Sequence, residues 1–156
     1  MTDGAAARVC LIQGANMVAL GHRQPAFYGR TTAAELDAML QDAAPRYGLS
    51  LDIHYVSREA EAIALIDRID AGEARGLIMN PAGFLYAGRS LEARLKVMDA
   101  PFIEVHITNI EQRGKRSATA AAATGMIAGL GVGSYITALM AMGALLDRSP
   151  GRRNGV

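Results

Sequence analysis

The segment Arg8-Val-Cys-Leu-Ile-Gln-Gly-Ala-Asn16 decides the fold, because it is an apolar run that ends in small and polar residues. The run predicts a strand over Arg8–Gln13. A helix is predicted next, over Thr32–Tyr47, since Thr32-Ala-Ala-Glu35 has the capping-box pattern and Gly48 suits a left-handed helix end. A strand and a helix are normally joined by about two to six residues, and this connection is several times longer. We therefore expect a lid, a binding loop or disorder between them.

Outward from this first unit, strands and helices alternate along the chain. Strands are predicted over Ser50–Val56, Gly76–Met79, Pro101–Ile107 and Gly125–Ala128, with Asn80-Pro-Ala-Gly83 ending the third strand of the chain. Helices are predicted over Arg58–Ala71, capped by Ser57, and over Arg89–Met98 and Gly133–Leu146. The order predicts an α/β fold of the flavodoxin-like, doubly wound type, in which helices cover both faces of a five-stranded parallel sheet. We expect one domain, residues 8–147, between disordered tails 1–7 and 148–156.

Composition excludes several classes of protein. The formal net charge of +1 gives no indication of a nucleic-acid partner. Cys10 is the one cysteine, so no disulfide forms within the chain, and we expect a cytoplasmic protein in which this thiol only packs. No secretory signal is visible at the N-terminus. The segment Ser117–Leu146 has no charge and is long enough to span a bilayer, but its glycines and missing aromatic belt favour a buried strand, a turn and a helix.

Polar side chains follow three of the predicted strands. The first strand ends in Gln13-Gly-Ala-Asn16, the third in Asn80 and the fourth in His106-Ile-Thr-Asn109. In doubly wound sheets, ligands bind outside the carboxyl ends of the strands, where the strand order reverses. The sequence therefore predicts a ligand site on this rim, and no cluster of residues has metal-ligand spacing.

Glu104 and His106 stand two residues apart in the fourth predicted strand, so both side chains point to the same side. A buried carboxylate must be paired, and beside an imidazole it fixes the tautomer and favours the charged form. Such an imidazolium suits a general acid. The alternative is a buried pair with a structural role only.

The long connection carries Arg23 and Tyr28. Either this is a solvated loop with an aromatic plug, or Arg23 stabilises a tyrosinate that acts as a base. Because the ordinary pKa of tyrosine is about 10, a base at neutral pH needs a pKa lower by about two or three units, which guanidinium groups in a dry site can supply. The loop after the fourth strand offers Arg113, Lys115 and Arg116, which otherwise form a solvated basic run.

These pieces together resemble type II 3-dehydroquinate dehydratase. The resemblance runs from about Arg8 to Leu146 and rests on five motifs in the family's order and spacing: Gln13-Gly-Ala-Asn-Met17, Leu20-Gly-His-Arg-Gln-Pro-Ala-Phe-Tyr-Gly29, Asn80-Pro-Ala-Gly83, Ile103-Glu-Val-His-Ile-Thr-Asn109 and Thr124-Gly-Met-Ile-Ala-Gly-Leu-Gly131. It implies trans elimination of water from 3-dehydroquinate through an enolate, giving 3-dehydroshikimate. It also implies no metal, cofactor or Schiff-base lysine, no membrane partner, and a homo-oligomer in which trimers form a dodecamer.

The resemblance also assigns roles to residues. Tyr28 would take the α-proton, Arg23 would lower the pKa of Tyr28, and Asn16 would help to stabilise the enolate. His106, oriented by Glu104, would protonate the leaving hydroxyl. The residues that would contact the substrate are Asn80, Ile107, Thr108 and Arg113, with Tyr86 at the position of a substrate-binding histidine.

Several positions depart from the family pattern. Ala15 replaces a proline, Gln24 a glutamate, Tyr86 a histidine and Ala93 an acidic residue. The second loop is shorter, so the family's further arginine corresponds to Lys115 or Arg116. The groups for elimination are thus kept while part of the substrate cradle has changed.

Three hypotheses follow from this division. The first is an active dehydroquinase, biosynthetic or a catabolic or secondary copy. The second is a paralogue that acts on a different small hydroxy-keto acid. The third, a non-catalytic binding or assembly protein, is opposed by the retention of the residues for chemistry.

Overall fold

The structure, a computed structural model, describes residues 4–86 and 88–147, without the side chains of residues 85 and 86. Five parallel strands form one sheet in the order β2-β1-β3-β4-β5. They are β1 (Ala7–Ala15), β2 (Leu49–Tyr55), β3 (Gly76–Ala82), β4 (Phe102–His106) and β5 (Gly125–Ala128). This is the predicted flavodoxin-like order, with β2 at an edge, and it places the reversal between β1 and β3.

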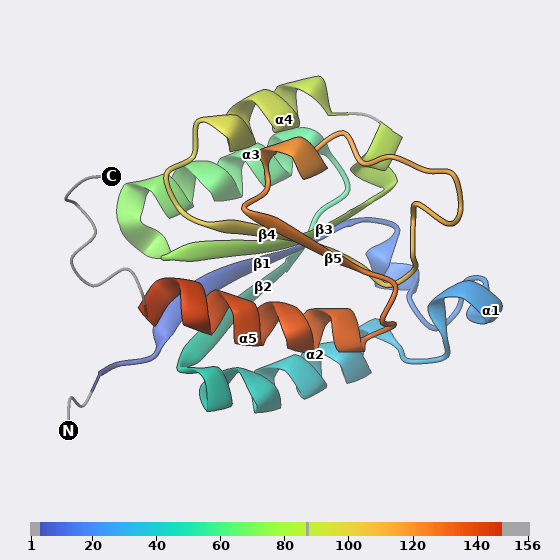
Figure 1. The fold of residues 1–156 in the computed structure, drawn as a ribbon, viewed down its shortest axis with the longest axis horizontal. Helices are drawn as coiled ribbons and strands as arrows, with labels where there is room; N and C mark the ends of the chain where they lie inside the picture. Colours follow the sequence, from blue (N-terminus) through green and yellow to red (C-terminus); the bar gives the residue numbers. More distant parts are fainter. Residues whose placement is uncertain (1–3, 87, 148–156) are drawn as a thin grey trace.

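Helices cover both faces of the sheet (Figure 1). The helices α2 (Ala33–Ala43) and α5 (Gly133–Asp147) lie on one face, and α3 (Glu59–Arg68) and α4 (Arg89–Lys96) lie on the other. Strand β1 shows why two layers of core form. Its side chains alternate, so that Val9 and Leu11 pack with α2 and α5 while Cys10 and Ile12 pack with α3 and α4.

The predicted first helix is confirmed at its start and is divided near its end. The Thr32 hydroxyl accepts from the Glu35 N–H at 3.2 Å, and the Glu35 carboxylate accepts from the Thr32 N–H at 2.8 Å, which completes the capping box. After Ala43 the chain tightens into the 3-10 turn η2 (Ala44–Tyr47), because Pro45 has no N–H with which to continue the α-helix. Gly48 ends it with a φ of +72°.

Two local predictions were wrong. Arg58, not Ser57, occupies the N-cap position of α3, without a side-chain cap. Asn80-Pro-Ala-Gly83 does not end β3 after Met79, because β3 continues to Ala82 along β1. Pro81 is tolerated there because β4 pairs with β3 only up to Met79. The absence of a side chain at Gly14 also matters, since a Cβ there would lie 2.2 Å from the Pro81 carbonyl oxygen.

The remaining elements are short or end a few residues from their predicted bounds. The predicted helix Arg58–Ala71 divides into α3 and a wide turn, η3 (Ile69–Glu73), while α4 ends at Lys96 and β5 has its predicted bounds. The uncharged segment Ser117–Leu146 contains the turn η5 (Ala120–Ala122), β5 and most of α5, as expected of a buried strand, turn and helix. Within the described ranges, no helix has both the length and the apolar character that crossing a bilayer requires.

The long connection after β1 is ordered and contains two short helices. We call residues 16–31 the lid; it includes η1 (Met17–Ala19) and α1 (Pro25–Tyr28), and Figure 1 shows α1 projecting beyond the end of the sheet. A further turn, η4 (Gly83–Tyr86), follows β3. The predicted tails 1–7 and 148–156 stay predictions, since residues 1–3 and 148–156 lie outside the described part of the chain.

Candidate active site

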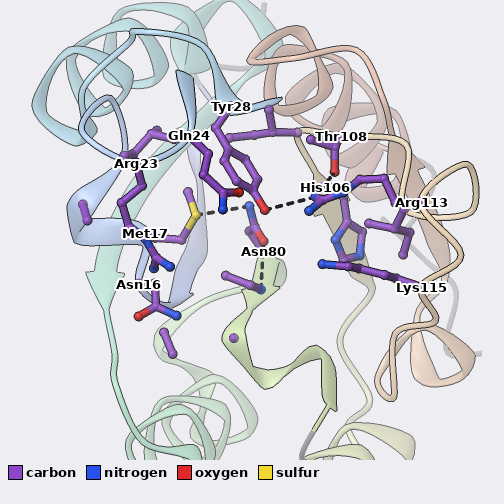
Figure 2. Close-up of a pocket in the computed structure, with 17 residues that line it drawn as sticks. Asn16, Met17, Arg23, Gln24, Tyr28, Asn80, His106, Thr108, Arg113 and Lys115 are labelled. Atoms are coloured by element: carbon purple, nitrogen blue, oxygen red, sulfur yellow. Dashed lines mark hydrogen bonds between the residues drawn. The ribbon is translucent and has the colours of Figure 1, made fainter. Parts of the chain in front are cut away.

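A pocket opens at the carboxyl ends of β1, β3 and β4, under the lid (Figure 2). Its cavity has a volume of about 200 Å³, on the scale of one small molecule. Eight of the side chains that the sequence nominated line it: Asn16, Arg23, Tyr28, Asn80, His106, Ile107, Thr108 and Arg113. The rim site expected from the strand ends is therefore present as one cavity.

His106 is held by Glu104, as the strand spacing predicted. Both side chains are buried, and His106 Nε2 lies 2.6 Å from Glu104 Oε1. Glu104 does not line the pocket, so it reaches a ligand only through His106. Its second oxygen, Oε2, accepts a hydrogen bond of 2.6 Å from the hydroxyl of Thr119. The carboxylate is thus satisfied at both oxygens although it is fully buried.

Tyr28 enters the pocket from the lid and is held by an arginine. Arg113 Nη1 donates to the Tyr28 hydroxyl oxygen at 3.0 Å and to the Thr108 hydroxyl at 3.1 Å. The Arg113 guanidinium also lies 4.9 Å from the centre of the Phe27 ring and 5.5 Å from that of Tyr28. Arg113 therefore joins α1 of the lid to the loop that follows β4.

Arg23 lies elsewhere in the pocket wall. Figure 2 shows it beside Asn16 and Met17, while Arg113, His106 and Lys115 stand on the opposite side of the cavity. In the described part of the chain, the hydrogen bond to the Tyr28 hydroxyl comes from Arg113. The influence of Arg23 on the tyrosine stays a prediction.

Backbone strain is concentrated at this pocket. Three described non-glycine residues have positive φ angles, Asn16 at 78°, Gln24 at 41° and Ala82 at 45°, and all three line the cavity. This left-handed region costs a non-glycine residue about 1 kcal/mol or more, so surrounding contacts must enforce it. Asn16 directly follows β1 and Ala82 is the last residue of β3, where the chain turns away from the sheet.

Asn80 belongs to a buried network that the sequence did not predict. Its side-chain N–H donates to the Tyr135 hydroxyl at 2.8 Å, and Tyr135 donates to Gln13 Oε1 at 2.7 Å. The Asn80 oxygen accepts from the backbone N–H of Ala82 at 3.0 Å. Burial raises the pKa of Tyr135, against the lowering effect of its hydrogen bonds with Asn80 and Gln13, so its hydroxyl stays protonated. The network fixes the orientation of the Asn80 carboxamide at the pocket wall.

A sequence signal existed for two of the missed residues. Tyr135 is an aromatic residue with a polar tip in an otherwise apolar helix, and a buried tyrosine hydroxyl needs a partner. Thr119 is a hydroxyl residue within a run of alanines, Ala118–Ala123. Neither position reveals its partner, because the partners come from distant strands.

The pocket wall is cationic. Arg23, Arg113 and Lys115 line it, whereas no aspartate or glutamate of the described residues does. Lys115 rather than Arg116 is thus the basic residue that the shortened second loop brings to the cavity. Tyr86 lies in η4, but its side chain is outside what the structure describes. In the described ranges, no group of three or more His, Cys, Asp or Glu side chains is arranged to hold a metal ion.

Comparisons with known proteins bear on this geometry. Residues 7–143 match the family described as dehydroquinase class II. The protein 3-dehydroquinate dehydratase 1 of Bradyrhizobium diazoefficiens is 32% identical over 153 residues, which cover 96% of this chain and 99% of that protein. The 3-dehydroquinate dehydratase of Xanthomonas campestris pv. campestris is 38% identical over 148 residues, covering 91% and 98%. The crystal structure of the type II dehydroquinase from Propionibacterium acnes matches with a TM-score of 0.84 at 30% identity, covering 91% of this chain and 99% of that one.

Proposed function

This chain belongs to the class II dehydroquinase family and is a 3-dehydroquinate dehydratase, a hydro-lyase; on that premise, we propose that Tyr28 is the base and His106 the acid of the elimination. The observation that carries the proposal is that both side chains line one cavity, Tyr28 from the lid and His106 from β4. Each is held by an ionisable partner, Arg113 and Glu104 respectively.

Proton removal is the first step of the proposed mechanism. The phenolate of Tyr28 takes the proton from the carbon next to the ketone of dehydroquinate, and the electron pair of that C–H bond moves into an enolate. Arg113 supports the phenolate, because a guanidinium that donates to the neutral hydroxyl at 3.0 Å donates more strongly to the anion. Arg23, also in the wall, adds positive potential at the same cavity.

Loss of the hydroxyl completes the reaction. The enolate collapses to a carbon–carbon double bond as the C–O bond breaks, and His106 gives its proton to the departing oxygen, so that water leaves. Glu104 supports the imidazolium through the 2.6 Å contact to Nε2. Across both steps, one proton and one hydroxide leave the substrate.

Substrate binding is assigned to the remaining wall. The three cations suit a carboxylate substrate. Thr108, Ile107 and Asn80 also line the cavity, and we assign them to contact hydroxyl and carboxylate oxygens of the substrate. Asn16 holds the enolate oxygen, directly or through water. We keep Tyr86 as a substrate contact on the resemblance alone.

We further propose that copies of this chain assemble into trimers and then a dodecamer in the cytoplasm. Support comes from three exposed apolar side chains on or near β5 and α5, namely Met126, Leu130 and Met140, exposed by 43%, 60% and 54%. Strand β5 is also an edge strand, and such an edge is a template for contact with another chain.

An absorbance assay tests the proposed activity. Elimination creates a conjugated enone, so purified protein incubated with 3-dehydroquinate should produce new ultraviolet absorbance. A panel of other small hydroxy-keto acids, assayed in parallel, tests the hypothesis that the chain acts on a different substrate. Turnover of a panel member and none of dehydroquinate would contradict the assignment of substrate.

A further inference from the structure

Thr119 is a buried hydroxyl behind the acid of the pocket. Its side chain is fully buried at the start of η5, and its hydroxyl lies 2.6 Å from Glu104 Oε2. The other Glu104 oxygen contacts His106 Nε2 at the same distance of 2.6 Å. Thr119 lines no part of the cavity, so it reaches the ligand only through these two residues.

The hydroxyl hydrogen bonds around Thr119 all donate toward Glu104. Its backbone N–H donates to the Ser117 hydroxyl oxygen at 3.4 Å, and the two hydroxyl oxygens are 3.2 Å apart. Since the single hydroxyl proton of Thr119 goes to Glu104, the proton between the two hydroxyls belongs to Ser117. The chain Ser117 to Thr119 to Glu104 therefore directs its protons at the carboxylate, which favours the ionised form that only accepts.

In the described part of the chain, the side chains opposite Glu104 on the neighbouring strands cannot donate a hydrogen bond in place of Thr119. On the neighbouring strands, Met79 and Met126 stand opposite Glu104, and neither titrates. The helix α4, which packs against η5, buries Leu91 and Leu95 on that side. The titratable groups in the pocket wall are His106 itself, Lys115, Tyr28, Arg23 and Arg113.

We propose that Thr119 is a positioning residue of the dehydration, whose hydroxyl holds Glu104 as an ionised acceptor for His106 Nε2–H. With Nε2 engaged in this way, the proton that His106 exchanges with the ligand is the one on Nδ1. This inference rests on the proposed function, in which His106 protonates the leaving hydroxyl.

The kinetic test compares Thr119→Val, which removes the hydroxyl at similar volume, with Thr119→Ser, which retains it. With dehydroquinate, we expect the valine variant to lose about tenfold in kcat with KM within about twofold, because a charged hydrogen bond is lost behind the acid. The acidic limb of its pH–rate profile should move up by about one pH unit, since a buried carboxylate with one donor fewer takes up a proton more readily. The serine variant should restore both.

Thr137→Val is the matched control, because the Thr137 hydroxyl bonds to the Gly133 carbonyl in α5, away from the pocket. Its pH–rate profile should equal that of the parent. A valine variant at 119 with the parental profile and kcat would overturn the proposal. If that variant does not fold, Thr119→Ala removes the same hydroxyl without added bulk and is judged by the same criteria.

A second measurement does not need activity. Nitrogen-15 NMR of the histidine rings follows the titration of His106, assigned by its loss in His106→Gln. We expect the His106 midpoint to move down in Thr119→Val, because a Glu104 carboxylate that protonates more readily supports the imidazolium less, and to return in Thr119→Ser. Identical titrations in all three proteins would overturn the inference. If Thr119→Val shifts the His106 titration but the parent protein does not convert dehydroquinate, the proposed function is refuted. The inference that Thr119 holds Glu104 for His106 is then retained.

Discussion

At the scale of residues, each group assigned to move a proton is held by a second residue from another part of the chain. Arg113 holds Tyr28, and Glu104 holds His106. Such partners fix the orientation of the side chain before a ligand arrives, and orientation is a large part of catalysis. At this scale, the Tyr28 hydroxyl and the buried Cys10 thiol can each be tested by a single substitution.

Tyr28→Phe should abolish dehydroquinate turnover, with a loss of at least about 10³-fold in kcat, because the base is removed while the ring stays in place. The measurement is the ultraviolet assay, with circular dichroism to confirm the fold. Tyr47→Phe, in η2 and outside the pocket, is the control and should retain activity. Ordinary turnover by Tyr28→Phe would remove Tyr28 from the mechanism.

Cys10 predicts a pH dependence of stability. Burial first, and the charge of Asp52 second, raise the pKa of the Cys10 thiol to about 12. Above the ordinary thiol pKa of about 8.5 the unfolded chain loses this proton and the folded chain does not, so stability falls as pH rises, by up to about 1.4 kcal/mol per pH unit.

Cys10→Ala should remove this slope. We expect the difference in unfolding free energy between parent and variant to shrink as pH rises from about 8 to 10, measured by urea denaturation at each pH. A difference that stays constant over that range would show that the native thiol ionises as readily as the unfolded one.

At the scale of elements, the helix α1 of the lid is joined to a residue far away in sequence. Arg113 lies 85 residues from Tyr28 along the chain, yet its guanidinium bonds to the Tyr28 hydroxyl and covers the Phe27 ring. Arg113→Met keeps much of the side-chain length but loses the hydrogen bonds and the charge. We expect the lid to detach more often and trypsin to cleave after Arg23 or Arg30 faster, by about three- to tenfold.

Cleavage is followed by mass spectrometry of timed digests. Arg113→Lys is the comparison, because it keeps the charge but not the planar fork that serves Tyr28 and Thr108 together; we expect an intermediate rate. Equal cleavage of parent and Arg113→Met would mean that the lid is held by other contacts.

The elements themselves were largely predictable from sequence, and the reasons are local. Apolar runs, the capping box at Thr32 and the left-handed glycine at Gly48 act within a few residues, so a single sequence reveals them. The extension of β3 through Pro81 was missed, because it depends on where pairing with β4 stops. The strand-end rule placed the site, but it does not reveal which arginine meets Tyr28 or that Thr119 meets Glu104, since those contacts are set by tertiary packing.

At the scale of the whole molecule, a single copy leaves an apolar surface exposed around β5 and α5, formed by Met126, Leu130 and Met140. We expect the parent to sediment as an assembly of many copies, and Met126→Lys combined with Leu130→Lys to sediment as a smaller species, because charges cannot be buried in an apolar contact without a partner. Analytical ultracentrifugation measures this. Val97→Lys, at a more exposed apolar position after α4, is the control and should not change the assembly.

A parent protein that sediments as one copy would contradict the proposed assembly. If the parent and the double variant are both assemblies of the same size, the contact lies on another face. Either result leaves the assignment of acid and base intact, because Tyr28 and His106 are held by Arg113 and Glu104 of the same chain.

The proposed base and the proposed acid lie on structurally different parts of the chain. His106 ends a buried strand inside the sheet, whereas Tyr28 lies on the short helix α1 of the lid and is only partly buried against one layer of the core. Substitutions in residues 21–31 can therefore change which hydrogen is reached, whereas substitutions around His106, or at the core residues Met17 and Leu20, disturb folding itself. Exchanging the lid segment between relatives is accordingly the most direct way to change the substrate to a different hydroxy-keto acid. His106 and Glu104, which serve the departure of the hydroxyl, would stay as they are.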